Sequence, residues 1–329
     1  MTTLVTGATG FLGCALVAEL VKRNQAVRVL VRDGRKALRQ FGDGVTMVVG
    51  DITDAARVQQ AVEGATIIYH LAGRLYHPGT SAELYRETHV EGTRTLLKAC
   101  LGQRRLQRIV HVSTTGVHGV TGQTPAAEDA PFAPTNPYEA TKLEGELLAL
   151  RACREQGLPV TVARPGLVYG PGDLHLLDFF RAIKRGLFRV IDGGRAVLHP
   201  VYIDDLTAAL LLCASSPQAS GRSYNIAGDQ HVMVRELATA IALAMGRKLP
   251  AGSIPLWLAN LAADVFAITP GMKGERAPLT RSRVQFLTNS RIYDIGRARS
   301  ELVYTPTVGL GEGMKATASW YYKHHYLDR

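Results

Sequence analysis

The chain has 329 residues, of which 46% are hydrophobic and 20% charged, and it contains no low-complexity tract. These values are typical of a globular protein with one large or two modest domains, and they exclude disordered, collagen-like and coiled-coil proteins. The four cysteines are scattered without a C-x-x-C pair, which argues against a disulfide framework or a zinc ribbon and favours reduced core thiols.

The net charge of +10 is concentrated in two basic stretches, residues 21–40 and Lys273–Arg299. Excess positive charge attracts phosphates, carboxylates and anionic lipid surfaces. We expect no nucleic-acid partner, because the sequence has no helix-turn-helix, zinc finger or aromatic RNA platform. The amino terminus lacks a secretion signal, and the longest apolar run, Ile254–Ile268, is too short to span a bilayer. We therefore expect a cytoplasmic protein that at most contacts a membrane surface.

In the first half of the chain, short β-branched runs alternate with longer amphipathic stretches. Repeated strand–helix–strand units require right-handed crossovers and a parallel sheet covered on both faces. The pattern predicts an α/β fold with a doubly wound parallel Rossmann sheet. The expected strands are Thr3–Thr6, Ala26–Val31, Val45–Val49, Thr66–His70, Arg108–Val112 and Pro159–Ala163, and the expected helices are Phe11–Arg23, Ala55–Val62, Glu83–Leu101 and Pro137–Glu155.

After residue 165 the alternation gives way to mixed elements. We therefore divide the chain into a Rossmann domain, residues 1–165, and a smaller mixed C-terminal cap, residues 166–329. Two strand-like segments, Pro200–Ile203 and Ser223–Ile226, are candidates to return to the sheet. The helical patterns of this half are Leu176–Arg185, Leu206–Ala214, Arg235–Met245 and Pro255–Ala267.

A glycine-rich loop, Thr6-Gly7-Ala8-Thr9-Gly10-Phe11-Leu12-Gly13, follows the first strand and opens the first helix. Glycines here permit a tight turn and a close approach of the backbone to a pyrophosphate, while the helix N-terminus supplies amide donors and positive potential. This position in the chain predicts dinucleotide binding, with an ordinary glycine turn as the alternative.

The spacing G-x-x-G-x-x-G resembles that of the extended branch of the short-chain dehydrogenase/reductase superfamily, the NAD-dependent epimerase/dehydratase type. Two later segments are also similar. Gly50-Asp51-Ile52 resembles the superfamily's adenine-contacting turn, and His70-Leu71-Ala72-Gly73 resembles its segment beside the cofactor ribose. The structural alternative for Asp51 is a helix N-cap.

The choice between NAD and NADP depends on the end of the second strand, which the adenosine ribose reaches. Val31 stands where NAD-preferring relatives carry an acid, and Arg32 follows it. Arg32 is expected to stack on adenine and bind a 2′-phosphate, helped by Arg35 and Lys36. NADP is therefore favoured, with NAD as the other candidate. Asp33 weakens this argument, and the alternative for Arg32 is a solvated surface arginine.

Tyr138 and Lys142 stand four residues apart on an expected helix that Asn136 caps and Pro137 starts. Residues at i and i+4 share a helix face, so the ammonium is expected to lie near the phenol and favour its ionised form. Tyr138 would then act as acid or base near neutral pH, and Lys142 would also hold the nicotinamide ribose. The alternative is a solvated helix face.

The segment Val112-Ser113-Thr114-Thr115-Gly116 at the end of the fifth strand resembles the superfamily's serine/threonine segment. Counting back from Gly119 assigns to Thr114 the hydroxyl that bonds the reacting oxygen, with Ser113 as the alternative. Hydride chemistry belongs to the cofactor, so we expect no metal. The resemblance implies cofactor contacts at Gly7, Ala8, Thr9, Gly10, Phe11, Leu12, Gly13, Arg32, Asp51, Ile52, Leu71, Ala72, Gly73, Pro165 and Val168, besides Tyr138 and Lys142.

Two leucines argue against a nucleotide-sugar substrate. Related epimerases and dehydratases usually place an Asn where this chain has Leu167 and an Arg where it has Leu198, with Arg195 as an imperfect substitute. Apolar side chains against diphosphate oxygens would be a costly mismatch.

Three further segments, Tyr169–Asp173, Pro278–Arg281 and Tyr293–Pro306, resemble the 3β-hydroxysteroid dehydrogenase group. That group includes sterol-4-carboxylate 3-dehydrogenases and reductases of long-chain 2-alkyl-3-keto acids, whose substrates are apolar. Residues 254–268 would form a lid or a membrane contact, with a buried cap helix as the alternative. The following basic run would meet a substrate carboxylate or anionic lipid, or Arg281 and Arg283 would form surface ion pairs.

The resulting interpretation is an NADP-preferring oxidoreductase acting on a secondary alcohol or ketone of a sterol-like substrate or a 3-keto or 3-hydroxy lipid acid. Its first rival is a nucleotide-sugar 4-epimerase or dehydratase with tightly bound NAD, and its second is a dinucleotide-sensing regulator without turnover. By analogy with the superfamily we expect a homodimer through Glu83–Leu101 and Pro137–Glu155.

Overall fold

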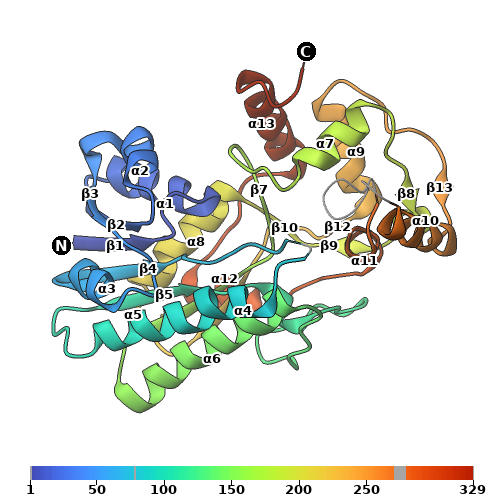
Figure 1. Ribbon diagram of the computed structural model, residues 1–329. Helices are drawn as coiled ribbons and strands as arrows, with labels where there is room; N and C mark the ends of the chain where they lie inside the picture. Colours follow the sequence, from blue (N-terminus) through green and yellow to red (C-terminus); the bar gives the residue numbers. More distant parts are fainter. Residues whose placement is uncertain (1, 78, 270–278, 329) are drawn as a thin grey trace.

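The computed structural model describes residues 2–77, 79–269 and 279–328. Pro278, and residues 273–278 of the second basic stretch, lie outside the described residues. The main sheet has seven parallel strands, which confirms the expected Rossmann architecture (Figure 1). In spatial order the strands are β11 (Ser223–Ile226), β6 (Val160–Pro165), β5 (Arg108–Val112), β4 (Ala65–His70), β1 (Thr2–Thr6), β2 (Ala26–Val31) and β3 (Thr46–Val49).

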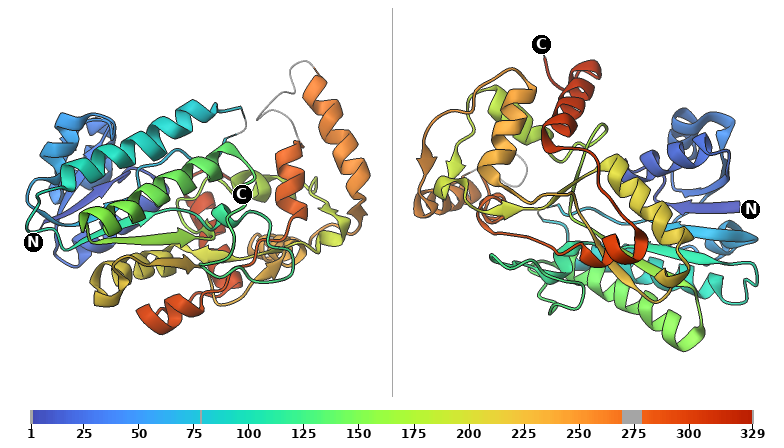
Figure 2. Two further views of the ribbon diagram at one scale, coloured as in Figure 1. Left: turned by 90° about the horizontal axis from the view of Figure 1, so that it is seen from below. Right: turned by 180° about the vertical axis from the view of Figure 1, so that it is seen from behind.

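Alternating apolar side chains explain why helices cover both faces of this sheet. Leu4 packs towards one face, and Val5 packs towards the other. Figure 2 shows α5 and α6 on one face and α8 with α12 on the other. The first layer is α3 (Ala55–Val62), α5 (Gly92–Cys100) and α6 (Pro137–Gln156); the second is α1 (Phe11–Lys22), α2 (Gly34–Phe41), α8 (Ile203–Ser215) and α12 (Gly296–Leu302).

The helix expected over residues 83–101 is interrupted by a wider turn. It consists of α4 (Ala82–Arg86), a π-helical turn (Glu87–Glu91) and α5. Such π turns insert one extra residue into a helix and often occur at functional sites. Here the turn carries His89, which is buried.

The two candidate returning strands behave differently. Ser223–Ile226 is β11 and pairs with β6, which extends the main sheet. The expected return of Pro200–Ile203 is not found, because β10 (Pro200–Tyr202) pairs with β7 (Leu167–Tyr169), and β11 already occupies the edge beside β6.

The rest of the second half forms the cap, seen at the right of Figure 1. The packing of α7 (Leu177–Lys184), α9 (Val234–Ala244) and α13 (Leu310–Lys323) gives the cap a core of its own. Beside it lie α10 (Leu256–Ile268), α11 (Arg281–Thr288), and the short strand pairs β8 (Val190–Ile191) with β13 (Ser253–Ile254) and β9 (Val197–Leu198) with β12 (Val232–Met233).

A buried ion pair joins α6 to β6. Arg164 Nε donates to Glu146 Oε1 at 3.0 Å, and both side chains are at most 2% exposed. The same guanidinium donates to the Glu128 carbonyl oxygen at 2.8 Å and lies 3.0 Å from His118 Nε2. Since Glu146 lies one turn after Lys142, this pair fixes the helix face that carries Tyr138 and Lys142.

We expect Glu146→Gln to lower the free energy of unfolding by about 3–5 kcal/mol, because it leaves the Arg164 charge buried without a counter-charge. Urea denaturation measures the loss. The matched control is Glu144→Gln, which removes an exposed partner of Arg86 and should cost about 0–1 kcal/mol. Equal losses in the two variants would contradict a dominant role for the buried pair.

Candidate active site

A continuous cavity of about 1630 Å³ runs from the glycine loop, past the carboxyl ends of β4 and β5, into the cap. The register sets Thr6 opposite His70 and His70 opposite His111, so these strand ends lie side by side. Every predicted site residue lines the cavity except Ala8, which is fully buried beneath the loop. The structure therefore brings the separate sequence motifs to one place.

The glycine loop has the shape of a phosphate cradle. Gly7 has φ +69°, and a Cβ there would lie 2.7 Å from the Ala72 backbone nitrogen. A Cβ on Gly13 would lie 2.3 Å from the Gly7 carbonyl oxygen. Gly10 caps α1 without a side chain, so the first amide groups of the helix stay open to a ligand. These features fit a dinucleotide pyrophosphate better than an ordinary turn.

Arg32 reaches the cavity edge with an unengaged guanidinium. The side chain is exposed and has no hydrogen-bond or ion-pair partner within the described residues. Asp33 does not neutralise it, because the Asp33 carboxylate accepts the Lys36 backbone amide at 2.9 Å and caps α2. Lys36 also lines this end.

Asp51 lines the cavity beside Ile52 and is not a helix cap. One carboxylate oxygen accepts from the backbone and the hydroxyl of Thr53, at 3.0 and 2.9 Å. The cap of α3 is Asp54 instead. The capping alternative for Asp51 is therefore wrong, and its second oxygen remains available to a ligand.

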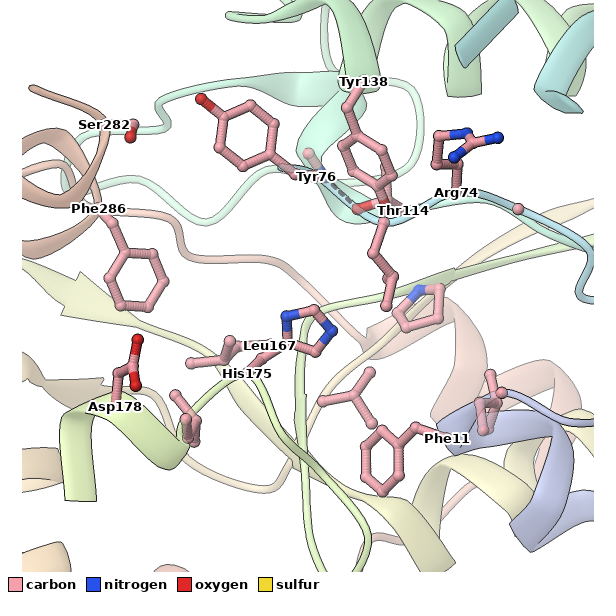
Figure 3. A pocket seen from close by; sticks show the side chains of 18 of the residues that line it. Phe11, Arg74, Tyr76, Thr114, Tyr138, Leu167, His175, Asp178, Ser282 and Phe286 are labelled. Carbon is pink, nitrogen blue, oxygen red and sulfur yellow. Dashed lines mark hydrogen bonds between the residues drawn. The ribbon is translucent and has the colours of Figure 1, made fainter. Parts of the chain in front are cut away.

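Tyr138 and Thr114 meet inside the cavity, as Figure 3 shows. The Asn136 side chain caps α6 by accepting the Glu139 amide at 3.0 Å, and Pro137 begins the helix, as expected. The Thr114 hydroxyl acts on the Tyr138 phenol and favours its ionised form. Ser113 also lines the cavity, but its hydroxyl is buried and has no partner among the described residues. Of the two hydroxyls, Thr114 is the one in contact with Tyr138.

The predicted effect of Lys142 on Tyr138 is absent from this arrangement. Burial raises the pKa of Tyr138 to about 12, and the hydrogen bond from Thr114 opposes that shift only in part. Lys142 points its ammonium at the Val112 carbonyl oxygen, and burial lowers its pKa to about 8. Desolvation dominates both groups, so the protein alone holds Tyr138 as a phenol.

Buried histidines lie behind Lys142. His70 lies 2.8 Å from the Thr6 hydroxyl and 3.0 Å from the Thr93 hydroxyl, and burial lowers its pKa to about 3. His70, His111 and His118 are all buried. His89 was not predicted, since an isolated histidine in a helical pattern carries no signal, yet its ring lies edge-on to Tyr138 with centroids 5.6 Å apart. No three His, Cys, Asp or Glu side chains among the described residues gather as a metal site.

The cap side of the cavity is largely apolar. Leu167 and Leu198 both line it. Arg195 does not, because it is exposed and pairs with Asp192 at 3.7 Å, so it is no substitute for a diphosphate ligand. Other apolar lining residues are Phe11, Leu75, Phe179, Phe188, Phe266 and Phe286.

The arginines predicted to meet a carboxylate are engaged elsewhere. Arg281 donates to Asp264 at 2.7 Å, and Arg283 donates to Asp178 at 3.1 Å. These surface ion pairs match the alternative that the sequence left open.

Helix α10 is not the buried cap helix that periodicity allowed. Only Ala259 and Ala263 are buried, and Ala262 and Phe266 face the cavity. No helix in the described part of the chain combines the length and apolar character needed to cross a bilayer. The exposed apolar residues of α10 are Leu256, Trp257, Leu258, Leu261, Val265 and Ile268.

Comparison with known proteins extends these observations. A family model described as NAD dependent epimerase/dehydratase family matches residues 3–227. The chain is 31% identical to 4-hydroxy-2-methyl-3-oxo-4-farnesyl-3,4-dihydroquinoline-1-oxide ketoreductase of Stigmatella aurantiaca, over 96% of this chain and 95% of that protein. It is 30% identical to 2-alkyl-3-oxoalkanoate reductase of Stenotrophomonas maltophilia, over 96% and 98%.

Two further relatives carry different activities in their names. 3beta-hydroxysteroid-dehydrogenase/decarboxylase isoform 1 of Arabidopsis thaliana is 29% identical, over 95% of this chain and 78% of that protein. Among solved structures, dTDP-glucose 4,6-dehydratase of Streptomyces venezuelae with NAD bound superposes with a TM-score of 0.80 at 26% identity, over 99% and 98% of the two chains. The resemblance to the extended superfamily and to its 3β-hydroxysteroid dehydrogenase group is confirmed.

The buried Lys142 should make stability depend on pH. Its pKa is about 8 in the folded chain and 10.5 ordinarily, so the unfolded chain binds more protons between these values and stability rises with pH there. Relative to Lys142→Met, the wild type should gain on the order of 3 kcal/mol between pH 7 and 10.5. Urea denaturation across this range measures it; a pH-independent difference between the two proteins would refute the buried ammonium.

Proposed function

The chain belongs to the NAD-dependent epimerase/dehydratase family and is an oxidoreductase of that family, and from that premise we propose its substrate class. It transfers a hydride between a nicotinamide cofactor and a secondary alcohol or ketone of an apolar substrate, either a sterol-like 3β-hydroxysteroid or a 3-keto or 3-hydroxy lipid acid. The observation that carries the proposal is the cavity itself, in which Tyr138 and Thr114 face a wall that includes Leu167 and Leu198.

The chain's own residues position the reacting oxygen and move its proton. The bound cofactor supplies or accepts the hydride. Tyr138, a phenol in this cavity, donates a proton to the oxygen during ketone reduction and accepts it back during alcohol oxidation. Thr114 hydrogen-bonds the same oxygen and orients it. Lys142 holds the nicotinamide ribose, and the apolar wall excludes water.

A nucleotide-sugar 4-epimerase or dehydratase with tightly bound NAD is the second candidate. The similarity to dTDP-glucose 4,6-dehydratase favours it. Against it stand Leu167 and Leu198, which would set apolar carbons against a diphosphate. The other rival hypothesis was a dinucleotide-sensing regulator without turnover. The names of the matched relatives, which are reductases and dehydrogenases, favour an enzyme instead.

We expect the purified protein to oxidise NADPH with a 2-alkyl-3-oxo acid or a 3-oxosteroid, and to leave UDP-glucose and dTDP-glucose unchanged. Tyr138→Phe should lower kcat by about 10²–10⁴-fold, because it removes the acid, while NADPH binding persists. Absorbance at 340 nm and fluorescence titration measure the two effects. Release of a tightly bound NAD, with conversion of a nucleotide sugar, would establish the second candidate instead.

We also propose that NADP is preferred over NAD. Support comes from the unengaged guanidinium of Arg32 at the ribose end, next to Lys36, and from the absence of an acid at Val31. A guanidinium binds a phosphate through paired, charge-assisted hydrogen bonds, whereas its hydrogen bond to a free 2′-hydroxyl is neither paired nor charged on both sides.

Arg32→Ala should weaken NADPH binding about 10–100-fold and change NADH binding by less than about threefold, since only the phosphate contact is lost. Isothermal titration measures both affinities. Arg35→Ala is the matched control. The sequence suggested that Arg35 would help Arg32, but in the structure Arg35 is exposed and does not line the cavity. Equal loss for the two nucleotides would place Arg32 on adenine rather than on a phosphate.

Two partner assignments also remain proposals. The exposed apolar side chains of α10 would rest on a lipid surface, from which an apolar substrate enters the cavity beside Phe266. Vesicle cosedimentation tests this proposal, and the Trp257→Ser variant should bind vesicles less than the wild type does.

A second copy of the chain would pair through α4, α5 and α6, where Leu84 and Leu147 are exposed. Light scattering tests this proposal, and the Leu84→Glu, Leu147→Glu double variant should have the mass of a monomer.

A further inference from the structure

Arg74 is held at the cavity by a clamp of buried side chains. His89 Nε2, in the π turn, lies 3.0 Å from both the backbone nitrogen and the carbonyl oxygen of Arg74. His89 Nδ1 lies 2.9 Å from the Thr141 hydroxyl, which itself donates to the Pro137 carbonyl oxygen at 2.8 Å. The backbone of Arg74 is thereby tied to the first turn of α6, which carries Tyr138.

The same clamp continues along the following residues. The Tyr85 ring stacks on His89 with centroids 5.7 Å apart, and the Tyr85 hydroxyl accepts the His77 amide at 2.8 Å. Burial and the Lys142 charge lower the pKa of His89 to about 3, so its ring stays neutral. Because the Thr141 hydroxyl donates to Pro137, Nδ1 of this neutral ring donates to Thr141 and Nε2 accepts the Arg74 backbone amide. Arg74, Leu75 and Tyr76 therefore form a fixed wall of the cavity beside Tyr138 (Figure 3).

The guanidinium of Arg74 has no counter-charge within the described residues. Its Nε is buried and has no hydrogen-bond partner in residues 2–77, 79–269 and 279–328. Two other cavity arginines are paired: Arg291 donates to Glu139 at 2.7 Å, and Arg181 lies 3.6 Å from Asp178. A buried donor without a partner is costly unless a ligand satisfies it, and a half-buried guanidinium lining a cavity favours an anion there.

We propose that Arg74 binds a carboxylate of the substrate and makes the enzyme selective for acids. Resting on the proposed function, this identifies the substrate as a 3-keto or 3-hydroxy acid whose carboxylate lies close to the reacting carbon. A planar guanidinium pairs with a carboxylate through two parallel hydrogen bonds. The binding lets the apolar tail lie along the cap, where Phe179 and Phe286 line the cavity.

A guanidinium such as that of Arg74 can bind either a substrate carboxylate or a cofactor phosphate, because both are anions with several acceptor oxygens. Two observations favour the substrate carboxylate. The cofactor phosphates are expected at the α1 N-terminus, whose cradle is formed by Gly7 and Gly13, whereas the Arg74 backbone is tied to the helix turn of Tyr138. The arms of the test separate these two sources.

The probe is decanoate, compared with methyl decanoate, titrated calorimetrically into protein saturated with NADPH. Decanoate should bind the wild type, and Arg74→Met should weaken that binding about 10–100-fold while leaving methyl decanoate within about threefold. Arg74→Lys should recover part of the affinity. Arg185→Met is the matched control, because Arg185 lines the cavity mouth but is exposed and should leave both affinities unchanged.

The proposal would be overturned if Arg74→Met weakened the binding of decanoate and methyl decanoate equally. It would also be overturned if the wild type bound the acid and the ester with the same affinity. Loss of NADPH affinity in Arg74→Met would assign the guanidinium to a cofactor phosphate instead. Because the titration needs no turnover, it stands apart from the assay of the proposed function: selective acid binding without NADPH oxidation would refute only the reaction. Thermal unfolding of each variant confirms that it is folded.

Discussion

Burial of Glu146 against Arg164 is the constraint on which the site depends. Tyr138, Lys142 and Glu146 follow one another at intervals of four on α6, so a single buried contact at the third position orients the other two. Arg164 in turn belongs to β6 and bonds the Glu128 carbonyl and His118, which anchors the loop after β5. Two charges removed from water need this full set of partners, and the set holds α6 in one rotational position.

Close backbone packing constrains the cofactor end of the cavity. Gly7 and Gly13 leave no room for a Cβ, because the loop, the start of α1 and the end of β4 are in backbone contact. This close approach lines up the carboxyl ends of β1, β4 and β5. In a sheet with order β11-β6-β5-β4-β1-β2-β3, β1 and β4 flank the point where the chain reverses direction across the sheet, and the cavity opens there.

Desolvation is the dominant electrostatic effect throughout the site. It raises the pKa of Tyr138 and lowers those of Lys142, His70 and His89, so each group tends towards its neutral form. A half-buried cation without a counter-charge is costly in such surroundings. Arg74 is one among the described residues, and its buried Nε has no hydrogen-bond partner there.

The sequence by itself determined the parallel sheet, the glycine loop, and the spacing of Tyr138 and Lys142. These features depend on local periodicity, turn chemistry and short intervals, all of which are present within short stretches of the sequence. It also indicated an apolar pocket through Leu167 and Leu198. It missed α2, α11, α12 and α13. The first three have only 8, 8 and 7 residues, so their periodicity is weak; α2 buries only Ala37.

Only the tertiary structure decided the rest. That Thr114 rather than Ser113 meets Tyr138, that Lys142 turns to the Val112 carbonyl, and that β10 leaves the main sheet all depend on contacts between distant segments. His89 and Arg74 gave no signal in the sequence for the same reason: their importance comes from the π turn and from the partners that each has or lacks. Burial and hydrogen-bond satisfaction are properties of the folded whole, and no local pattern of residues encodes them.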